Sequence, residues 1–220
     1  MHAIPRRFST FLALCIAAAG ILGGVGCDNK DAQAIRAMLV QYDTANNSKN
    51  GRLAKECVTK SSDAQYESIR RHALYSDERT VRALGPYIKH QVLMTRNRAS
   101  AAQLEVLTGE DYIVWTTNEG WFANGDSGWS TAFGKITVKG DFATGVVLQD
   151  GEPTGDKVHF LKEDGRWRLD ETTMGQHMDQ WYRDLAKFEG MSVDDLLIYI
   201  EEEDSGKEIS DSIWQPMIRK

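Results

Sequence analysis

The sequence predicts an α+β fold, in which N-terminal helices pack on a curved antiparallel sheet and a helical extension follows. Three observations predict this class. Apolar residues recur at helical spacing up to about residue 119, they alternate with polar residues over 130–170, and helical spacing returns from 172. The 220 residues are 41% hydrophobic and 26% charged, which is typical of a globular chain and excludes a disordered, collagenous or coiled-coil one.

The first 27 residues are predicted to be a targeting segment rather than part of the fold. Arg6 and Arg7 precede Phe11–Leu22, an apolar run that is too short to span a bilayer comfortably. The following Val25-Gly26-Cys27 resembles a bacterial lipobox, in which a signal peptide (1–26) is removed and the cysteine is acylated. The alternative is an ordinary secretory signal in which Cys27 is incidental.

Lipidation would place the protein in the cell envelope, as a membrane-anchored protein that faces the periplasm or the exterior. Acyl chains on Cys27 would provide the anchor. Removal of Arg6 and Arg7 changes the formal net charge from −6 to −8. Cys15 is lost with the signal, and we interpret the remaining thiol, Cys57, as a small buried hydrophobe rather than a nucleophile.

Charge is distributed unevenly along the chain. Residues 49–98 contain eleven basic and five acidic residues, whereas residues 99–220 contain 11 basic and 24 acidic ones. One interpretation is a basic helical face that lies on anionic lipid headgroups. The alternative is that the two regions form ion pairs with each other or are simply solvated. Nucleic-acid binding is not expected of an acidic, exported chain.

Six helices are expected before the sheet. The first covers 31–47 and carries Ile35, Met38, Leu39 and Tyr42 on one face. The others are expected over 53–59, from Ser62, after Ser76, from Pro86 and over 109–119.

Alternating residues then predict an antiparallel meander with one buried face. Asp164-Gly165 between two alternating runs is the strongest local signal for a hairpin, and it places Phe160 on the same face as Trp167. The strands are expected over 130–139, 141–149, 157–162 and 166–170, with a loop at 150–155.

The last 50 residues are predicted to be helical. Gly190 is expected to end a first helix, and Ser192 to begin a second one. The apolar stripe of the first helix consists of Met174, Met178, Trp181, Leu185 and Phe188.

This order of elements resembles the nuclear transport factor 2-like cone of ketosteroid-isomerase-like and polyketide-cyclase-like proteins. The resemblance is carried by Gly140–Val147, Gly151–Gly155 and His159–Asp170, and the last of these is similar to the final hairpin of such domains. The whole chain is similar to uncharacterised planctomycete-type lipoproteins with a comparable helical tail. The domain organisation that this implies is a signal peptide at 1–26, the cone at 27–171 and a helical extension at 172–220.

The resemblance also suggests where to look for catalytic residues. In the isomerase-like members, a tyrosine and two carboxylates inside the cone act on a carbonyl substrate. Tyr42 and Asp43 lie on the first helix, where such pockets begin, but adjacent helical residues point about 100° apart, so both cannot face one pocket. No second inward carboxylate can be matched. We therefore expect Tyr42 to pack in the core and Asp43 to be solvated, with an enzyme that uses Tyr42 as the alternative.

Aromatic residues are the candidates for a ligand pocket. Trp121 and Trp129 flank a glycine-containing loop and would rim the mouth of the cone, and Phe160 and Trp167 would line it together with Tyr42. The alternative is that these aromatic side chains pack in the core and at the sheet edges.

The sequence contains no pattern for covalent or metal chemistry. The histidines lack the spacing of a metal site, and no Gly-x-Ser-x-Gly motif occurs. We therefore predict a protein without metal or cofactor that binds a small apolar ligand or a protein partner without catalysis. The alternatives are a small isomerase- or cyclase-type enzyme and an oligomeric subunit of an envelope assembly.

Overall fold

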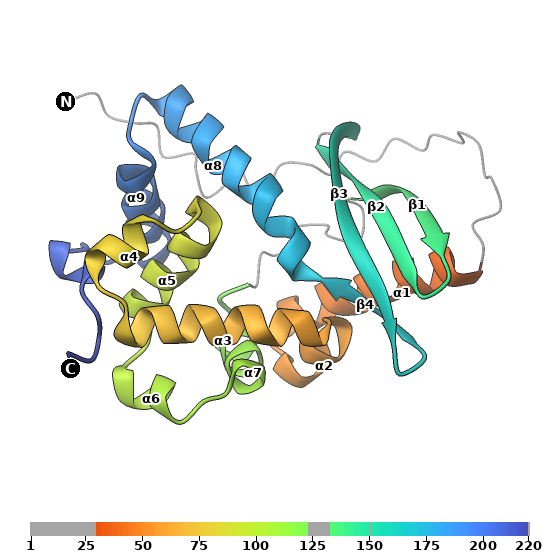
Figure 1. Ribbon diagram of the computed structural model, residues 1–220, viewed down its shortest axis with the longest axis horizontal. Helices are drawn as coiled ribbons and strands as arrows, with labels where there is room; N and C mark the ends of the chain where they lie inside the picture. Colours follow the sequence, from red (N-terminus) through yellow and green to blue (C-terminus); the bar gives the residue numbers. More distant parts are fainter. Residues whose placement is uncertain (1–29, 123–132, 150, 220) are drawn as a thin grey trace. The chain divides into compact units, whose positions relative to one another are not determined.

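The computed structural model describes residues 30–122, 133–149 and 151–219, and Figure 1 shows their secondary structure. These residues form helices and one four-stranded antiparallel sheet, so the α+β class is confirmed. Cys27 and Trp129 lie outside the described residues. None of the helices within the described ranges combines the length and the apolar composition that crossing a bilayer requires.

The chain divides into two compact units. A sheet unit contains the described residues of 1–59 and 113–171, and a helical unit contains those of 60–112 and 172–220. Residues 60–112 thus group with the C-terminal helices, and the predicted cone at 27–171 stays a prediction.

The sheet unit is built from two helices, the second half of α7 (Gly109–Asn118) and the sheet. Its strands follow one another in the order β1-β2-β3-β4, and α1 packs on β1 and β4. Ile35 and Leu39 of α1 are fully buried, as the helical spacing predicts. The bounds are α1 (Lys30–Asn47), α2 (Gly51–Cys57), β1 (Phe133–Lys139), β2 (Phe142–Gln149), β3 (Glu152–Glu163) and β4 (Arg166–Asp170).

A close approach between β2 and a phenylalanine ring organises the core of this unit. Phe160 of β3 is fully buried, and its ring lies over Gly145 of β2. A Cβ atom at position 145 would lie 2.9 Å from a ring carbon of Phe160, so only glycine admits the ring here. Phe133 of β1 meets the same ring edge-to-face, with centroids 5.8 Å apart.

The hairpin between β3 and β4 forms where the sequence predicts it. Asp164 and Gly165 have positive φ values of 53° and 77°, as a two-residue turn with the twist of the strands requires. The register pairs Glu163 with Arg166 and Lys162 with Trp167.

The predicted loop at 150–155 is largely strand, which is a correction. β3 begins at Glu152, which pairs with Gln149, so only residues 150 and 151 separate the two strands. Pro153 suggested a loop because proline cannot donate to a strand ladder. It is accommodated next to a register shift between Val146 and Leu148 of β2.

The helical unit surrounds α5, and this explains why residues 60–112 group with the C-terminal helices. Helix α5 packs against α3, α8 and α9, and Val92 and Leu93 on it are fully buried. The bounds are α3 (Lys60–Tyr75), α4 (Glu78–Arg82), α5 (Pro86–Arg98), α6 (Ala101–Glu105), α8 (Gly175–Glu189) and α9 (Val193–Ser205), with 3-10 turns η3 (Glu171–Met174) and η4 (Asp211–Trp214).

The starts of two short helices in the helical unit differ from the prediction. The cap of α4 is Asp77 rather than Ser76, because the Asp77 side chain accepts a hydrogen bond from the Thr80 amide. Helix α6 is not predicted from its apolar residues, although Ser100 and Gln103 form a capping box at its start.

The predicted apolar stripe of α8 is only partly buried. Met174, just before the helix, is buried, but Phe188 is 85% exposed, and Tyr182 and Ala186 are buried instead. A heptad-like spacing of 3.5 residues drifts around a helix of 3.6 residues per turn, so the far end of the stripe leaves the buried face.

A buried carboxylate joins α9 to the end of α5. Glu201 is fully buried and accepts two hydrogen bonds from Arg98, each of 2.7 Å, and one of 2.7 Å from the Asn97 amide. A carboxylate out of water requires such partners.

We predict that Glu201→Ala lowers the free energy of unfolding by about 3–5 kcal/mol, because Arg98 then loses its buried anionic partner. Urea unfolding of both proteins measures the change. Glu203→Ala, an exposed acidic position of the same helix, serves as the control and should change the value by less than about 0.5 kcal/mol. Equal effects of the two substitutions would contradict the role given to Glu201.

Candidate functional site

A tyrosine and a carboxylate meet in the interior of the sheet unit. Tyr42 of α1 is 8% exposed and Glu171, directly after β4, is 5% exposed. The Tyr42 hydroxyl donates a hydrogen bond to Oε1 of Glu171. Glu171 is thus the buried carboxylate that could not be identified from the sequence. It lies 129 residues from Tyr42, and no local pattern links the two. Asp43 is half-buried rather than solvated.

The predicted pocket residues do not gather around one cavity. Phe160 is fully buried against Phe133 and Gly145, and Trp167 is 5% exposed. Trp121 packs edge-to-face on Trp115, with ring centroids 4.9 Å apart. Tyr42 and Phe160 are therefore packed in the core, Trp167 is buried as well but also borders a groove, and Trp129 lies outside the described residues.

A groove of about 400 Å³ lies on the outside of the sheet unit, and Trp167 is the one predicted pocket residue within the described ranges that lines it. One wall is a face of α1, and the other is formed by α2 and the β3–β4 hairpin. The lining consists of Asp31, Ala34, Ala37, Met38, Gln41, Glu56, Cys57, Lys162, Gly165, Arg166 and Trp167.

Asp31 holds one end of this groove together. Its Oδ1 accepts a hydrogen bond of 2.9 Å from Lys162 Nζ and one of 2.8 Å from Trp167 Nε1. These bonds from Lys162 and Trp167 hold the pKa of Asp31 below its ordinary value, and the bond to Asp31 raises the pKa of Lys162. The ammonium of Lys162 also lies 5.5 Å from the ring centroid of Trp167.

A second, more exposed ion pair lies on the rim of the groove. Arg166 Nη1 is 3.3 Å from Glu56 Oε2, and the two side chains are 70% and 56% exposed. An exposed pair of this kind contributes little to stability. Sequence reasoning missed all four charged residues of the groove. The predicted hairpin register was the one available signal, since it places Lys162 opposite Trp167.

Cys57 faces the groove but is not a reactive thiol. It is 1% exposed, its Sγ donates to the carbonyl of Leu53 at 3.3 Å, and burial raises the pKa of the thiol to about 12. Its interpretation as a small buried hydrophobe is confirmed.

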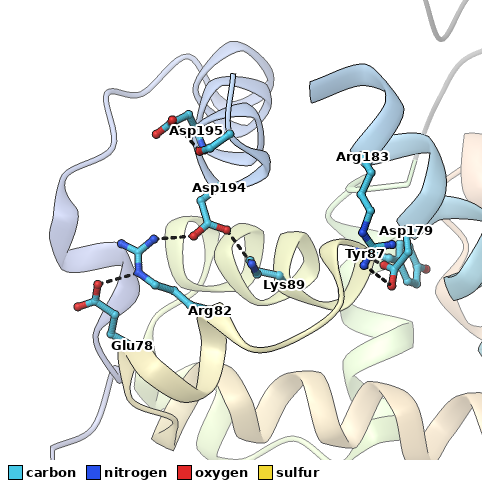
Figure 2. Close-up of polar contacts among 9 residues, drawn as sticks. Glu78, Arg82, Tyr87, Lys89, Asp179, Arg183, Asp194 and Asp195 are labelled. Carbon is cyan, nitrogen blue, oxygen red and sulfur yellow. Dashed lines mark hydrogen bonds and ion pairs between the residues drawn. The ribbon is translucent and has the colours of Figure 1, made fainter. Parts of the chain in front are cut away.

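Ion pairs inside the helical unit use several of the basic residues of 49–98. Figure 2 shows Arg82 between Glu78 of α4 and Asp194 of α9, with distances of 2.7 and 2.6 Å. Lys89 of α5 approaches the other oxygen of Asp194 at 2.6 Å. Together with the Arg98–Glu201 pair, these contacts favour the interpretation in which the basic and acidic regions pair with each other.

Within the described ranges, no group of three or more His, Cys, Asp or Glu side chains is arranged to hold a metal ion. Comparison with models of known protein families, with curated proteins and with solved structures finds no match for this chain.

We predict that Tyr42→Phe lowers the free energy of unfolding by about 1–3 kcal/mol, because a buried carboxylate loses a hydrogen-bond donor. Urea denaturation measures the change. Tyr75→Phe, at a position 39% exposed, is the control and should lower the free energy of unfolding by less, because water reaches this side chain. If the two variants unfold alike, the Tyr42–Glu171 contact does not contribute as we infer.

We predict that the Cys57 thiol of the native protein reacts with Ellman's reagent at least about 100-fold more slowly than an exposed thiol, because it is buried and protonated. The measurement uses residues 27–220 with Cys27→Ala, in which Cys57 is the only cysteine, and compares them with the same chain carrying Ser48→Cys, an exposed position. In denaturant both chains should react fast. A fast native reaction of Cys57 would show that the groove opens around it.

Proposed function

We propose that this protein is an exported lipoprotein, anchored to a membrane of the cell envelope through acylated Cys27, whose folded part is a non-catalytic binding module. The lipobox-like sequence Val25-Gly26-Cys27 carries the anchoring part of the proposal. Helix α1 begins at Lys30, which leaves almost no linker between the acylated residue and the sheet unit.

We further propose that the sheet unit is a curved nuclear transport factor 2-like cone. The four-stranded antiparallel meander and the packing of α1 on it support this idea. The grouping of residues 60–112 with the C-terminal helices departs from the usual arrangement, because those helices would be expected to cover the sheet. A resemblance in fold does not by itself indicate an activity.

The groove supports a binding role better than a catalytic one. The apolar part of its lining consists of Ala34, Ala37, Met38 and Trp167, and ion pairs lie beside it. Ligand sites commonly combine an apolar surface with a few placed polar groups. A small apolar ligand or a protein partner would bind there.

The second candidate is an isomerase- or cyclase-type enzyme, and the contact between Tyr42 and Glu171 favours it. A buried phenol beside a carboxylate can polarise a carbonyl and move a proton. Neither residue lines the groove, and the fully buried ring of Phe160 fills part of the interior of the unit. Incubation with 5-androstene-3,17-dione, followed by absorbance of the conjugated enone, tests this candidate. Turnover that is abolished by both Tyr42→Phe and Glu171→Gln would establish the enzyme and overturn the non-catalytic module.

We predict that Cys27→Ala releases the protein from the membrane fraction of the producing cell, because acyl chains provide the anchor. Fractionation followed by immunoblotting measures the distribution. Cys57→Ala, which removes the buried thiol and not the proposed acylation site, is the control and should remain with the membranes. Retention of the Cys27→Ala protein would refute lipidation at this position.

A further inference from the structure

The groove begins close in sequence to the proposed lipid anchor. Two residues separate Cys27 from Lys30, and three Cα–Cα steps span at most about 11 Å. Asp31, one residue further, is part of the groove lining. The headgroup layer on each side of a bilayer is roughly 5–8 Å thick. An acylated Cys27 would therefore keep the nearer end of the groove at or beside the headgroups.

From this end the groove extends along one face of α1. Asp31, Ala34, Met38 and Gln41 recur at intervals of three and four residues, which places them on one side of the helix. The ten helical steps from Asp31 to Gln41 span about 15 Å. Ala34 and Ala37 are exposed, so their small side chains leave room for a chain-like ligand.

The charges of the lining determine which kind of headgroup fits. Two cations, Lys162 and Arg166, are balanced by two carboxylates, Asp31 and Glu56. A purely anionic headgroup would meet repulsion from the two carboxylates, so the lining offers no net attraction for it. A headgroup that carries both a phosphate and an ammonium group complements the exposed Arg166–Glu56 pair, because each charge finds an opposite partner.

We infer that the groove binds the headgroup of a zwitterionic phospholipid of the phosphatidylethanolamine type. Arg166 binds the phosphate, Glu56 binds the ammonium group, and Ala34 and Ala37 contact the glycerol and the first methylenes. The Lys162–Asp31 pair remains closed, since Trp167 also donates to Asp31. This inference rests on the proposed lipidation of Cys27, which brings the groove to the membrane.

The test uses the mature chain, residues 27–220, with Cys27→Ala, so that no acyl chain contributes to binding. Cosedimentation is measured with vesicles of phosphatidylethanolamine and phosphatidylcholine in equal parts. We expect binding that Arg166→Gln and Glu56→Gln each weaken by about fivefold, the loss expected for one ionic contact at a membrane surface. Ala37→Gln, which fills the groove at an exposed helical position, should weaken binding at least as much.

Two matched controls lie outside the groove lining. Arg52→Gln removes an exposed cation of α2, and Val40→Gln removes an apolar side chain of α1 that is 53% exposed. Both should bind the vesicles as the parent chain does. All variants are compared by urea unfolding, and only those with an unchanged midpoint are interpreted.

Three outcomes would overturn the inference. The first is no binding to the zwitterionic vesicles, and the second is equal binding by the groove variants and the controls. The third is binding confined to phosphatidylglycerol vesicles and lost at high salt, which would indicate a basic surface instead. None of these results depends on acylation, whereas the cell fractionation of Cys27→Ala reports acylation alone, so the two proposals fail separately.

Discussion

The Asp31 carboxylate is the contact on which the candidate groove depends. It receives one hydrogen bond from Lys162 and one from Trp167, which stand opposite each other on β3 and β4. A single carboxylate thereby connects the first turn of α1 to both strands of the hairpin. Trp167 is 5% exposed, and a buried indole N–H requires an acceptor. Without Asp31 the indole would lose that acceptor, and the two walls of the groove would lose their shared contact.

Side chains fill part of the interior of the sheet unit, and for this reason we assign ligand binding to the groove on its outside. The ring of Phe160 lies over Gly145 and against Phe133, so that part of the interior is filled by side chains. Tyr42 and Glu171 form a buried polar contact in the same unit. Such a pair can serve specificity of packing, because moving Tyr42 away would take a hydrogen-bond donor from a buried carboxylate. The same contact can therefore exist without any catalytic purpose.

Local sequence signals predicted the elements, and long-range contacts decided the site. The spacing of Ile35 and Leu39 predicted α1, and Asp164-Gly165 predicted the hairpin, since both depend on neighbouring residues. Asp31 is only an acidic residue in the first turn of a helix until the hairpin, 131 residues away, is placed beside it. Glu171 meets Tyr42 across 129 residues, and Glu201 meets Arg98 across 103. Helix periodicity also could not reveal that α5 packs with α8 and α9, because its apolar face is compatible with either unit.

Ion pairs within the protein limit how strongly its basic residues could attract a membrane. From the sequence, the excess of basic residues in 49–98 suggested an electrostatic attraction to anionic lipids. In the helical unit, however, Arg82 and Lys89 share Asp194, and Arg98 is paired with Glu201. In the sheet unit, the groove beside the proposed anchor carries two cations and two carboxylates. A basic surface attracts lipid over a Debye length and is screened by salt, whereas paired charges act only at contact. If Cys27 is acylated as we propose, attachment of this protein depends on the acyl chains, and the groove contacts a headgroup only at close range.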